Sequence, residues 1–388
     1  MSSTTATDMA DARERLVDAL TAGGALAAGS AWRGAFASVP REVFAPRFTL
    51  SGLNGGREYA PGDRGYAAAV YTDTTLITRR DATGAAVSSS SEPSLMARML
   101  EAFTVREAAR VLEIGTGTGY NTALLCHRLG ADRVTSIDVE PELTALARTR
   151  LAGAGFTPLV VTGDGTGGHA EGAPYDGILA TCGVQRIPSA WPGQVRPGGI
   201  IVTNIGNGIA RLTVDGDGGA EGGFLPEDAA FMLARPAPDY LAPAAAQFTG
   251  LIARGTGTRR VMELPLPAAE PTRDLPGIIR ATAHEVWMVQ HDVLSLSLTS
   301  VFASEAGEMF HGLVHPPTGS WARITPQEGR RVLVEHEGPR DLWAERLALV
   351  AQWIDAGRPG PGAYTLTVTG TGAHTLRRTG PAPATWAL

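Results

Sequence analysis

The stretch Val111-Leu-Glu-Ile-Gly-Thr-Gly-Thr-Gly-Tyr120 places a short apolar strand, a glycine-rich turn and the start of a helix in direct succession. Glycines let the backbone approach a ligand closely, and a helix N-terminus offers free N–H groups to that ligand. Strand and helix patterns keep alternating through residues 109–215, with further strands predicted at 133–137, 159–161, 177–180 and 200–203. This alternation predicts an α/β fold with a mostly parallel sheet and helices on both of its faces.

The spacing of the turn bears on the kind of ligand. Gly115, Gly117 and Gly119 do not follow the dinucleotide pattern, in which the last glycine comes three residues after the second. Glu113 lies at the strand end just before the turn, and its negative charge would repel a pyrophosphate. The same charge suits the cationic sulfonium and ammonium groups of S-adenosylmethionine. A nicotinamide-dependent dehydrogenase and a tight turn without a ligand are the alternatives, and they fit these residues less well.

Two further acidic residues follow the next two strands. Asp138 ends the strand in Val134-Thr-Ser-Ile-Asp-Val139, where a carboxylate can accept both hydroxyls of a ribose. Asp164 lies after the third strand, in Val161-Thr-Gly-Asp-Gly165, where it could receive an adenine amino group. An aspartate at such a place can also be only a helix N-cap. Three acidic turns in order after three strands favour the cofactor site.

These motifs and four other stretches resemble a protein L-isoaspartyl (D-aspartyl) O-methyltransferase over roughly residues 10–215. The four stretches are Val39-Pro-Arg-Glu-Val-Phe-Ala-Pro46; Tyr71-Thr-Asp73 with Leu76-Ile77; Ser91-Glu-Pro-Ser-Leu-Met-Ala-Arg-Met99; and Pro174-Tyr-Asp-Gly-Ile178 with Ile187-Pro188 and Arg196-Pro-Gly-Gly-Ile-Ile-Val202. Together they are far more specific than the glycine turn alone. The resemblance implies a Rossmann-like class I methyltransferase fold that uses S-adenosyl-L-methionine.

The resemblance also implies which residues form the site. Ser91 matches the family serine that faces both the cofactor and the substrate carboxylate, so we expect it to be the catalytic residue. The expected cofactor-binding residues are Ser88, Ser91, Glu113, Gly115, Thr116, Gly117, Asp138, Val139, Asp164 and Gly165. Two residues depart from the family pattern, because Glu92 replaces a neutral residue and Met96 a polar one. Glu92 would repel a substrate carboxylate unless it points away or pairs with an arginine such as Arg98.

Composition excludes several other classes of protein. The net charge is −6 and the sequence pI is about 5.8, so a broadly basic nucleic-acid-binding surface is not expected. All 33 basic residues are arginine, which excludes lysine Schiff-base chemistry and a P-loop lysine. Cys126 and Cys182 are the only cysteines, and no apolar run approaches the ~18 residues of a membrane span. With a polar start and no visible signal peptide, the expected compartment is the cytoplasm.

We predict four segments along the chain. Residues 1–105 form N-terminal helices and a substrate loop, 106–235 the S-adenosylmethionine-binding core, 236–275 a linker or irregular wrap, and 276–388 a smaller C-terminal α+β module. In that module we expect strands at 285–302 and 331–335, a helix at 342–356, and a hairpin of 364–369 with 374–378. His311 and His315 are four residues apart, but their stretch lacks helical support and a nearby carboxylate pattern, so no metal site is expected.

The length of the C-terminal part bears on the function. Repair methyltransferases of the family need little more than the first 215 or so residues, and about 150 extra residues are present here. The chain therefore resembles extended relatives that tailor ribosomally synthesised peptides such as graspetides and lanthipeptides. Those relatives methylate one aspartate of a cyclised precursor, giving aspartimide or isoaspartate. The alternatives are general repair of isoaspartyl proteins and a non-catalytic peptide-binding scaffold. We expect a peptide as the partner, and neither a nucleic acid nor a membrane.

Overall fold

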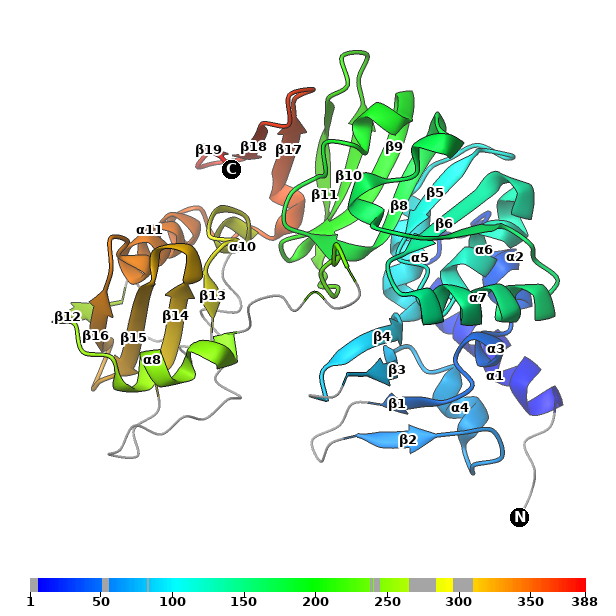
Figure 1. Ribbon diagram of the computed structural model, residues 1–388, viewed down its shortest axis with the longest axis horizontal. Helices are drawn as coiled ribbons and strands as arrows, with labels where there is room; N and C mark the ends of the chain where they lie inside the picture. The colour runs from blue at the N-terminus through cyan, green and yellow to red at the C-terminus, as the bar shows by residue number, and fades with distance from the viewer. Residues whose placement is uncertain are drawn as a thin grey trace.

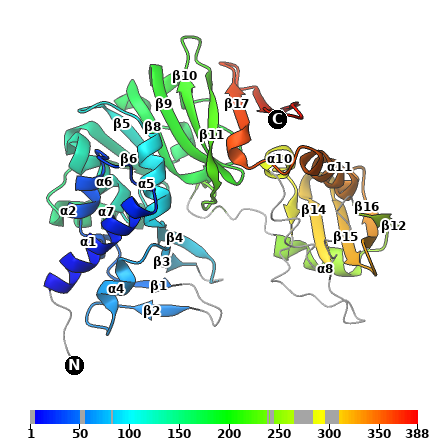
Figure 2. The same ribbon diagram turned by 180° about the vertical axis from the view of Figure 1, so that it is seen from behind.

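The computed structural model describes residues 6–50, 56–81, 84–237, 240, 245–264, 284–295 and 310–388. The described strands form three sheets, of ten, four and five strands (Figure 1). The four-stranded sheet lies below the ten-stranded sheet in this view, and the five-stranded sheet lies to its left. Figure 2 shows the same arrangement from behind. None of the described helices is both long and apolar enough to cross a membrane.

The ten-stranded sheet has the order β19-β18-β17-β11-β10-β9-β8-β5-β6-β7. Its parallel strands are β5 (Val111–Ile114), β6 (Val134–Asp138), β7 (Leu159–Thr162), β8 (Tyr175–Val184) and β9 (Val195–Ile205). The two strands that follow run antiparallel, and they are β10 (Gly208–Val214) and β11 (Ala220–Asp228). The strand order reverses at β5, with β6 and β7 on one side and β8 and β9 on the other. Ligands bind at such a switch point, outside the carboxyl ends of the strands.

One face of the parallel half carries helices. Their buried residues join Val111, Val134 and Leu179 in one core cluster. The helices are α1 (Ala6–Ala22), α2 (Arg33–Ser38), α5 (Pro93–Ala102), α6 (Tyr120–Leu129) and α7 (Pro141–Gly153). The core of the other face contains Tyr175 and Trp191 and none of these helices, which differs from the predicted helices on both faces. The connections there form only short 3-10 turns, because glycine and proline are frequent in them.

The four-stranded sheet carries four consecutive serines, residues 88–91, at its edge strand. These residues are called the serine-rich stretch below. The sheet is antiparallel, in the order β2-β1-β3-β4. Its strands are β1 (Phe48–Leu50), β2 (Arg57–Tyr59), β3 (Leu76–Arg80) and β4 (Ala86–Ser90), with the short helices α3 (Arg41–Phe44) and α4 (Tyr66–Val70). Residues 88–90 therefore lie in a strand. Pro93 occupies the first turn of α5, where its missing N–H costs no helical hydrogen bond.

The five-stranded sheet packs between two helices, α8 (Thr249–Arg254) and α11 (Leu342–Asp355). Its antiparallel strands are β12 (Thr258–Glu263), β13 (Leu294–Ser295), β14 (His311–His315), β15 (Ser320–Pro326) and β16 (Arg331–Glu337). The helix at 342–356 and the strand at 331–335 are thus confirmed. The linker expected at 236–275 instead contributes α8 and β12 to this region.

The strand expected at 285–302 is wrong over its first residues. Residues His284–Val289 form the helix α10, and only Leu294 and Ser295 pair as a strand. His284, Glu285, Val286 and Met288 are all buried, and a short segment buried on most sides has no clear period to separate a helix from a strand. Residues 296–302 lie outside the described part of the chain.

The last three strands do not belong to the C-terminal five-stranded sheet. They are β17 (Tyr364–Val368), β18 (His374–Arg378) and β19 (Ala384–Ala387), and β17 pairs with β11 of the ten-stranded sheet. The predicted hairpin is confirmed. The module predicted over 276–388 does not include these strands, because they belong to the ten-stranded sheet. Without β17, β11 would be the edge of the large sheet and would present unpaired N–H and C=O groups, and β17 pairs with them.

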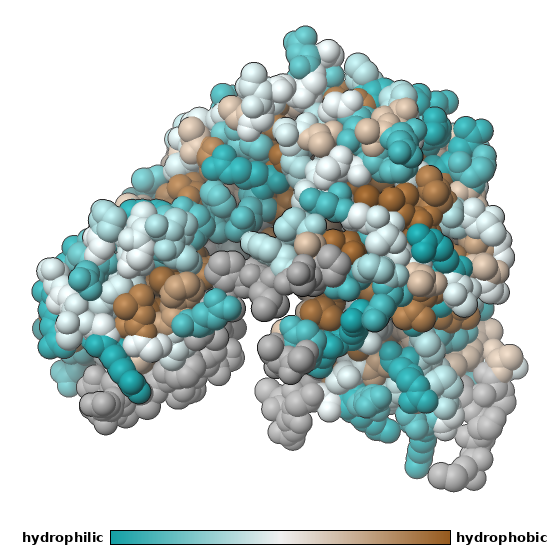
Figure 3. Space-filling view, in the orientation of Figure 1, coloured by the Kyte–Doolittle hydropathy of each residue, from teal (hydrophilic) through white to brown (hydrophobic). Residues whose placement is uncertain are grey.

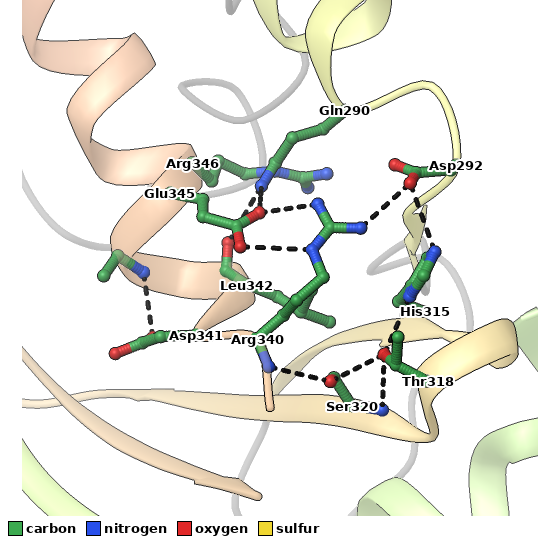
Figure 4. Close-up of polar contacts among 11 residues, drawn as sticks. Gln290, Asp292, His315, Thr318, Ser320, Arg340, Asp341, Leu342, Glu345 and Arg346 are labelled. Atoms are coloured by element: carbon green, nitrogen blue, oxygen red, sulfur yellow. Dashed lines mark hydrogen bonds and ion pairs between the residues drawn. The ribbon is translucent and has the colours of Figure 1, made fainter. Parts of the chain in front are cut away.

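A polar network holds α10, α11 and the five-stranded sheet together (Figure 4). The guanidinium of Arg340 lies between two carboxylates, with Nη2 2.7 Å from Glu345 Oε2 and Nη1 2.9 Å from Asp292 Oδ2. His315 Nε2 lies 3.1 Å from the same Asp292 oxygen, and Gln290 Nε2 donates to Glu345 at 3.1 Å. Because each charge has partners on another element, the network fixes the packing of these elements.

A second network joins α10 to the ten-stranded sheet. Glu285 is fully buried, and its Oε1 pairs with Arg378 of β18 and accepts the hydroxyl of Tyr364 of β17 at 2.8 Å. On the same helix, the ring of His284 packs against Phe224 of β11, with centroids 4.0 Å apart. The helix α10 is therefore anchored to three strands of the large sheet.

This joint gives a prediction about stability. Arg378→Met should lower the free energy of unfolding by about 3 kcal/mol or more, because it leaves the buried Glu285 carboxylate without its cation. The neighbouring Arg377 is exposed and provides the matched control, Arg377→Met, which should change the stability little. Urea unfolding followed by circular dichroism measures both, and equal effects of the two substitutions would contradict this role of the ion pair.

Candidate active site

A cavity of about 370 Å³ lies at the carboxyl ends of β5 and β6. Three parts of the chain that are distant in sequence line it: the glycine turn with the end of β6, the serine-rich stretch, and residues 230–235. The expected cofactor-binding residues that line it are Ser88, Ser91, Gly115, Thr116, Gly117, Asp138, Val139 and Gly165. The two remaining expected residues, Glu113 and Asp164, are not among the lining residues. The fold thus brings most of the predicted site together at the switch point of the sheet.

Close packing explains two of the glycines. Gly115 has φ of +95°, which residues with a side chain rarely adopt. A Cβ there would lie 3.1 Å from the hydroxyl oxygen of Thr181, which donates to the Gly115 carbonyl at 2.7 Å. A Cβ on Gly165 would lie only 2.5 Å from Cγ2 of Ile114. The backbone on this side of the cavity therefore requires residues without side chains.

Glu113 supports the glycine turn from behind. Its carboxylate is fully buried and accepts hydrogen bonds from Asn121 Nδ2 at 2.7 Å, Thr122 Oγ1 at 2.5 Å and Ser136 Oγ at 2.6 Å. Burial raises the pKa of Glu113 to about 7, although the three hydrogen bonds act in the opposite direction. The predicted role, a charge that faces a cationic ligand, does not fit this position. The carboxylate instead joins β5, β6 and the start of α6.

Asp138 lines the cavity from the end of β6. Its Oδ2 accepts the N–H of Gly117 at 2.8 Å, and its Oδ1 accepts the N–H of Glu140 at 3.0 Å. Burial raises the pKa of Asp138, and these two N–H groups partly oppose that effect. A carboxylate oxygen has two lone pairs, so each oxygen can still accept a hydroxyl from the cavity. The side chain both fixes the glycine turn and offers acceptors to a ligand.

Asp164 is exposed and caps a short 3-10 turn, Gly165–Gly167. Its Oδ1 accepts the N–H of Thr166 at 2.9 Å, and the Thr166 hydroxyl lies 2.7 Å and 2.8 Å from the two carboxylate oxygens. This is the N-cap role that the sequence left open as the alternative. The adjacent Gly165 is buried and lines the cavity, so this turn contributes backbone to the site.

The strand β4 brings the serine-rich stretch to the opposite side of the cavity. Ser88 is buried and accepts the hydroxyl of Thr78 at 3.1 Å, whereas Ser91 is half-buried just beyond the strand. Glu92 does not line the cavity, because its carboxylate accepts the Ser94 hydroxyl at 2.7 Å. Arg98, the cation considered for Glu92, pairs instead with Glu227 at 3.3 Å. The carboxylate of Glu92 is thus not part of the cavity wall.

Sequence reasoning missed two parts of the site. The first is Arg41, a fully buried residue whose Nη2 donates to the carbonyl of Ser91 at 2.9 Å. The second is the segment 230–235, which lies against the end of β8, since Gly183 donates to the Met232 carbonyl and accepts from the Ala234 N–H, both at 2.8 Å. The family signature around residue 41 could have pointed to the arginine. No local motif marks residues 230–235, because only the strand pairing returns them to the cavity.

The described residues contain no group of three or more His, Cys, Asp or Glu side chains that could hold a metal ion. His315 pairs with Asp292 and lies 2.8 Å from the hydroxyl oxygen of Thr318. His311 is buried on the same strand, and burial lowers its pKa to about 3. These histidines are therefore parts of the packed C-terminal sheet.

The buried Glu113 predicts a pH dependence of stability. Its pKa is raised from the ordinary value of 4.5 to about 7, so the folded protein keeps this proton to a higher pH than the unfolded chain. Stability from this group is fully present below pH 4.5 and is lost as the pH rises through 7. The difference between the two pKa values corresponds to about 3 kcal/mol.

The measurement is urea unfolding of the wild type and of Glu113→Gln between pH 4.5 and pH 8. The stability of the wild type relative to the variant should decrease by up to about 3 kcal/mol as the pH rises through this range. Asp132→Asn, at an exposed aspartate, is the matched control and should show no such change relative to the wild type. A pH-independent difference between Glu113→Gln and the wild type would contradict the raised pKa.

Comparison with known proteins agrees with this geometry. The family described as Protein-L-isoaspartate(D-aspartate) O-methyltransferase (PCMT) matches residues 57–217. The Protein-L-isoaspartate O-methyltransferase of Koribacter versatilis is 45% identical over 118 residues, which cover 30% of this chain and 52% of that protein. The protein of the same name from Thermotoga maritima is 36% identical over 144 residues, or 37% of this chain and 45% of that protein. The chain thus spans about half the length of the curated relatives that it matches.

A solved structure named protein-L-isoaspartate O-methyltransferase shares the fold. It aligns with a TM-score of 0.51 and 21% sequence identity, and the alignment covers 96% of this chain and 99% of that one. At this identity the likeness concerns the fold alone, and it includes the C-terminal sheets. Residues 57–217 of this chain therefore match the protein-L-isoaspartate O-methyltransferase family, and the chain has the α/β fold of the solved structure of that name, with an additional sheet-rich C-terminal region.

Proposed function

We propose that the chain is an S-adenosylmethionine-dependent carboxyl O-methyltransferase that esterifies an aspartate or isoaspartate side chain in a peptide. The observation that carries the proposal is the composition of one cavity. The glycine turn, Asp138 and the serine-rich stretch line the same space of about 370 Å³. Methyl transfer requires the cofactor and the substrate carboxylate to lie in one cavity. Here one wall offers hydrogen-bond acceptors to the cofactor, and the opposite wall offers serine hydroxyls to the carboxylate.

The residues present fit the cofactor. At Gly115–Gly117, where the glycines carry no side chain, the cofactor could approach the backbone closely. Asp138 would accept hydrogen bonds from the ribose hydroxyls, with the lone pairs left on its two carboxylate oxygens. Val139, Leu143 and Ile137 add apolar surface for an adenine ring. When bound, S-adenosylmethionine supplies an electrophilic methyl group on a sulfonium. The chain's own task is to hold the acceptor carboxylate in line with that group.

The chemistry needs no general base from the protein. An aspartyl carboxyl group has an ordinary pKa near ~3.9, so it is ionised at neutral pH and its oxygen is already nucleophilic. Ser91 would orient that oxygen through its hydroxyl, and the cavity walls would exclude water from it. The methyl ester carries a better leaving group than the free carboxylate does. The next backbone nitrogen attacks the ester carbonyl carbon, the C–N bond forms as the C–O bond to methoxide breaks, and methoxide leaves with the N–H proton as methanol. The product is a succinimide, and this step needs no further catalysis.

The cofactor assignment predicts the effect of one substitution. Asp138→Ala should weaken S-adenosylmethionine binding by about 1–3 kcal/mol, because the ribose hydroxyls lose a charged acceptor. Asp132→Ala, at an exposed aspartate, is the matched control and should bind normally. Isothermal titration calorimetry measures both affinities. Unchanged affinity in folded Asp138→Ala would refute the assignment.

For the substrate, we favour a constrained aspartate in a ribosomally synthesised peptide, leading to aspartimide or isoaspartate. The support is the C-terminal region, which adds a five-stranded sheet beside an otherwise complete site. In Figure 3 the part formed by β12–β16 lies at the left and the part formed by β1–β4 at the lower right. A rigid, cyclised peptide loses little conformational entropy when it binds beside the site.

General repair of isoaspartyl proteins is the second candidate function. The observation that favours it is the fold shared over 96% of this chain with a solved protein-L-isoaspartate O-methyltransferase. Because that shared fold includes the C-terminal sheets, the kinetic comparison of the two peptides below decides between tailoring and repair. A non-catalytic peptide-binding scaffold is the third, and it predicts cofactor binding without methyl transfer.

The substrate proposal is tested with the full-length enzyme. Removal of the residues after 240 would also delete β17, which pairs with β11, so truncation would disturb the large sheet itself. The measurement is kcat/KM for methyl transfer to a cyclic peptide with one aspartate and to a linear isoaspartyl peptide of matched composition. We expect preference for the cyclic peptide. Equal or better activity on the linear peptide would favour repair, and no transfer to either, with the cofactor bound, would favour the scaffold.

A further inference from the structure

Arg41 lies directly beneath the serine-rich stretch and is fully buried. Its guanidinium donates only to oxygens of the surrounding chain, at distances of 2.9–3.2 Å. The acceptors are the carbonyls of Val70, Thr72, Thr74, Ser90 and Ser91 and the hydroxyl of Ser90. One side chain therefore fixes the turn before β3 and the end of β4. The negative ends of five peptide dipoles point at this cation and not into the cavity.

The charge of Arg41 is not neutralised by an ion pair. Within the described part of the chain, no carboxylate forms a salt bridge with it. The carboxylate of Glu42 is bonded to the Tyr71 hydroxyl, and Asp73 accepts the N–H of Ser94 at 2.8 Å. Burial lowers the pKa of Arg41 to about 10, with Tyr120 and Asp73 acting in the opposite direction. The guanidinium is therefore still a cation at neutral pH.

We propose that Arg41 is a positioning residue that makes the site selective for an anionic carboxylate substrate. It acts through Ser91, whose carbonyl it holds, and through the positive potential that its charge adds on the serine side of the cavity. This inference rests on the proposed function. It goes beyond that function by assigning the recognition of the substrate's charge to a residue that does not touch the cavity.

The positive charge of Arg41 predicts which kinetic constant, KM or kcat, depends on this residue. Methyl transfer joins an anionic oxygen to the carbon of a cationic sulfonium, so the C–O bond forms, the C–S bond breaks, and both charges are lost. A fixed cation stabilises the bound carboxylate before the reaction more than the neutral products. Arg41 should therefore lower the KM of the substrate, while kcat depends mainly on alignment by Ser91.

The cofactor pair provides a probe that does not depend on knowing the peptide. S-adenosylmethionine carries the sulfonium charge, whereas S-adenosylhomocysteine is neutral there and otherwise matches it. Arg41→Gln should shift the ratio of the two affinities towards S-adenosylmethionine by about fivefold or more, because a nearby positive charge is gone. Arg41→Lys keeps the charge and should keep the wild-type ratio. A loop that is only loosened would weaken both cofactors alike and leave the ratio unchanged.

Three further variants sharpen the calorimetric test. Asp73→Asn removes the carboxylate that raises the pKa of Arg41, and the ratio should shift the other way, towards S-adenosylhomocysteine. This variant keeps Arg41 in place, so it tests the potential even if Arg41→Gln does not fold. Ser91→Ala keeps the cation and should leave the ratio unchanged. Arg33→Gln, on the exposed surface of α2, is the matched arginine control and should also leave it unchanged.

Steady-state kinetics with the better of the two peptides described above completes the test. Arg41→Gln should raise KM about tenfold while kcat changes by less than about threefold, and Arg41→Lys should restore much of the KM. The proposal is overturned if the affinity ratio is the same in wild type, Arg41→Gln and Asp73→Asn, or if Arg41→Lys and Arg41→Gln behave alike. Failure of the proposed function is seen separately, as a wild type that binds neither cofactor, and the role of Arg41 would be rejected with it.

Discussion

The buried carboxylate of Glu113 is the interaction on which the site depends. It lies at the end of β5, where the strand order of the large sheet reverses, and it accepts from Asn121, Thr122 and Ser136. These three donors belong to the helix after the glycine turn and to the neighbouring strand. Desolvation of a carboxylate is unfavourable, and the three hydrogen bonds offset part of that cost. The turn is thereby held from below, and its upper side is left for the cavity.

The upper side is completed by residues that come from elsewhere in the chain. Asp138 fixes Gly117 from the end of β6, Arg41 holds the carbonyl of Ser91 on the opposite wall, and residues 230–235 close the third side against β8. Two buried ionisable side chains thus organise the two walls. Glu113 lies behind the glycine turn on the proposed cofactor side, and Arg41 lies behind Ser91 on the proposed substrate side.

The C-terminal region is integrated into the fold and is not a separate module on a linker. The strands β17–β19 extend the large sheet beyond β11, and α10 is anchored to that sheet by Glu285 and its partners Arg378 and Tyr364. The Arg340 network then connects the segment just after α10 with α11 and the five-stranded sheet. The proposed substrate preference is for this reason tested on the whole chain.

The sequence by itself determined the features that depend on local order: the strand, glycine turn and helix at 111–120, the place of Asp138 at a strand end, and the α/β class with its parallel half. The first two follow from neighbours within a few residues of one another, and the third follows from the alternation of strand and helix patterns over residues 109–215. Only the tertiary structure decided that Glu113 faces the core, that Asp164 caps a turn, and that Arg41 and residues 230–235 belong to the site. The direction of a side chain at a strand end, and the partner of a buried charge, are set by packing between distant segments. No local pattern records those contacts, because burial and hydrogen bonding act on the folded chain as a whole.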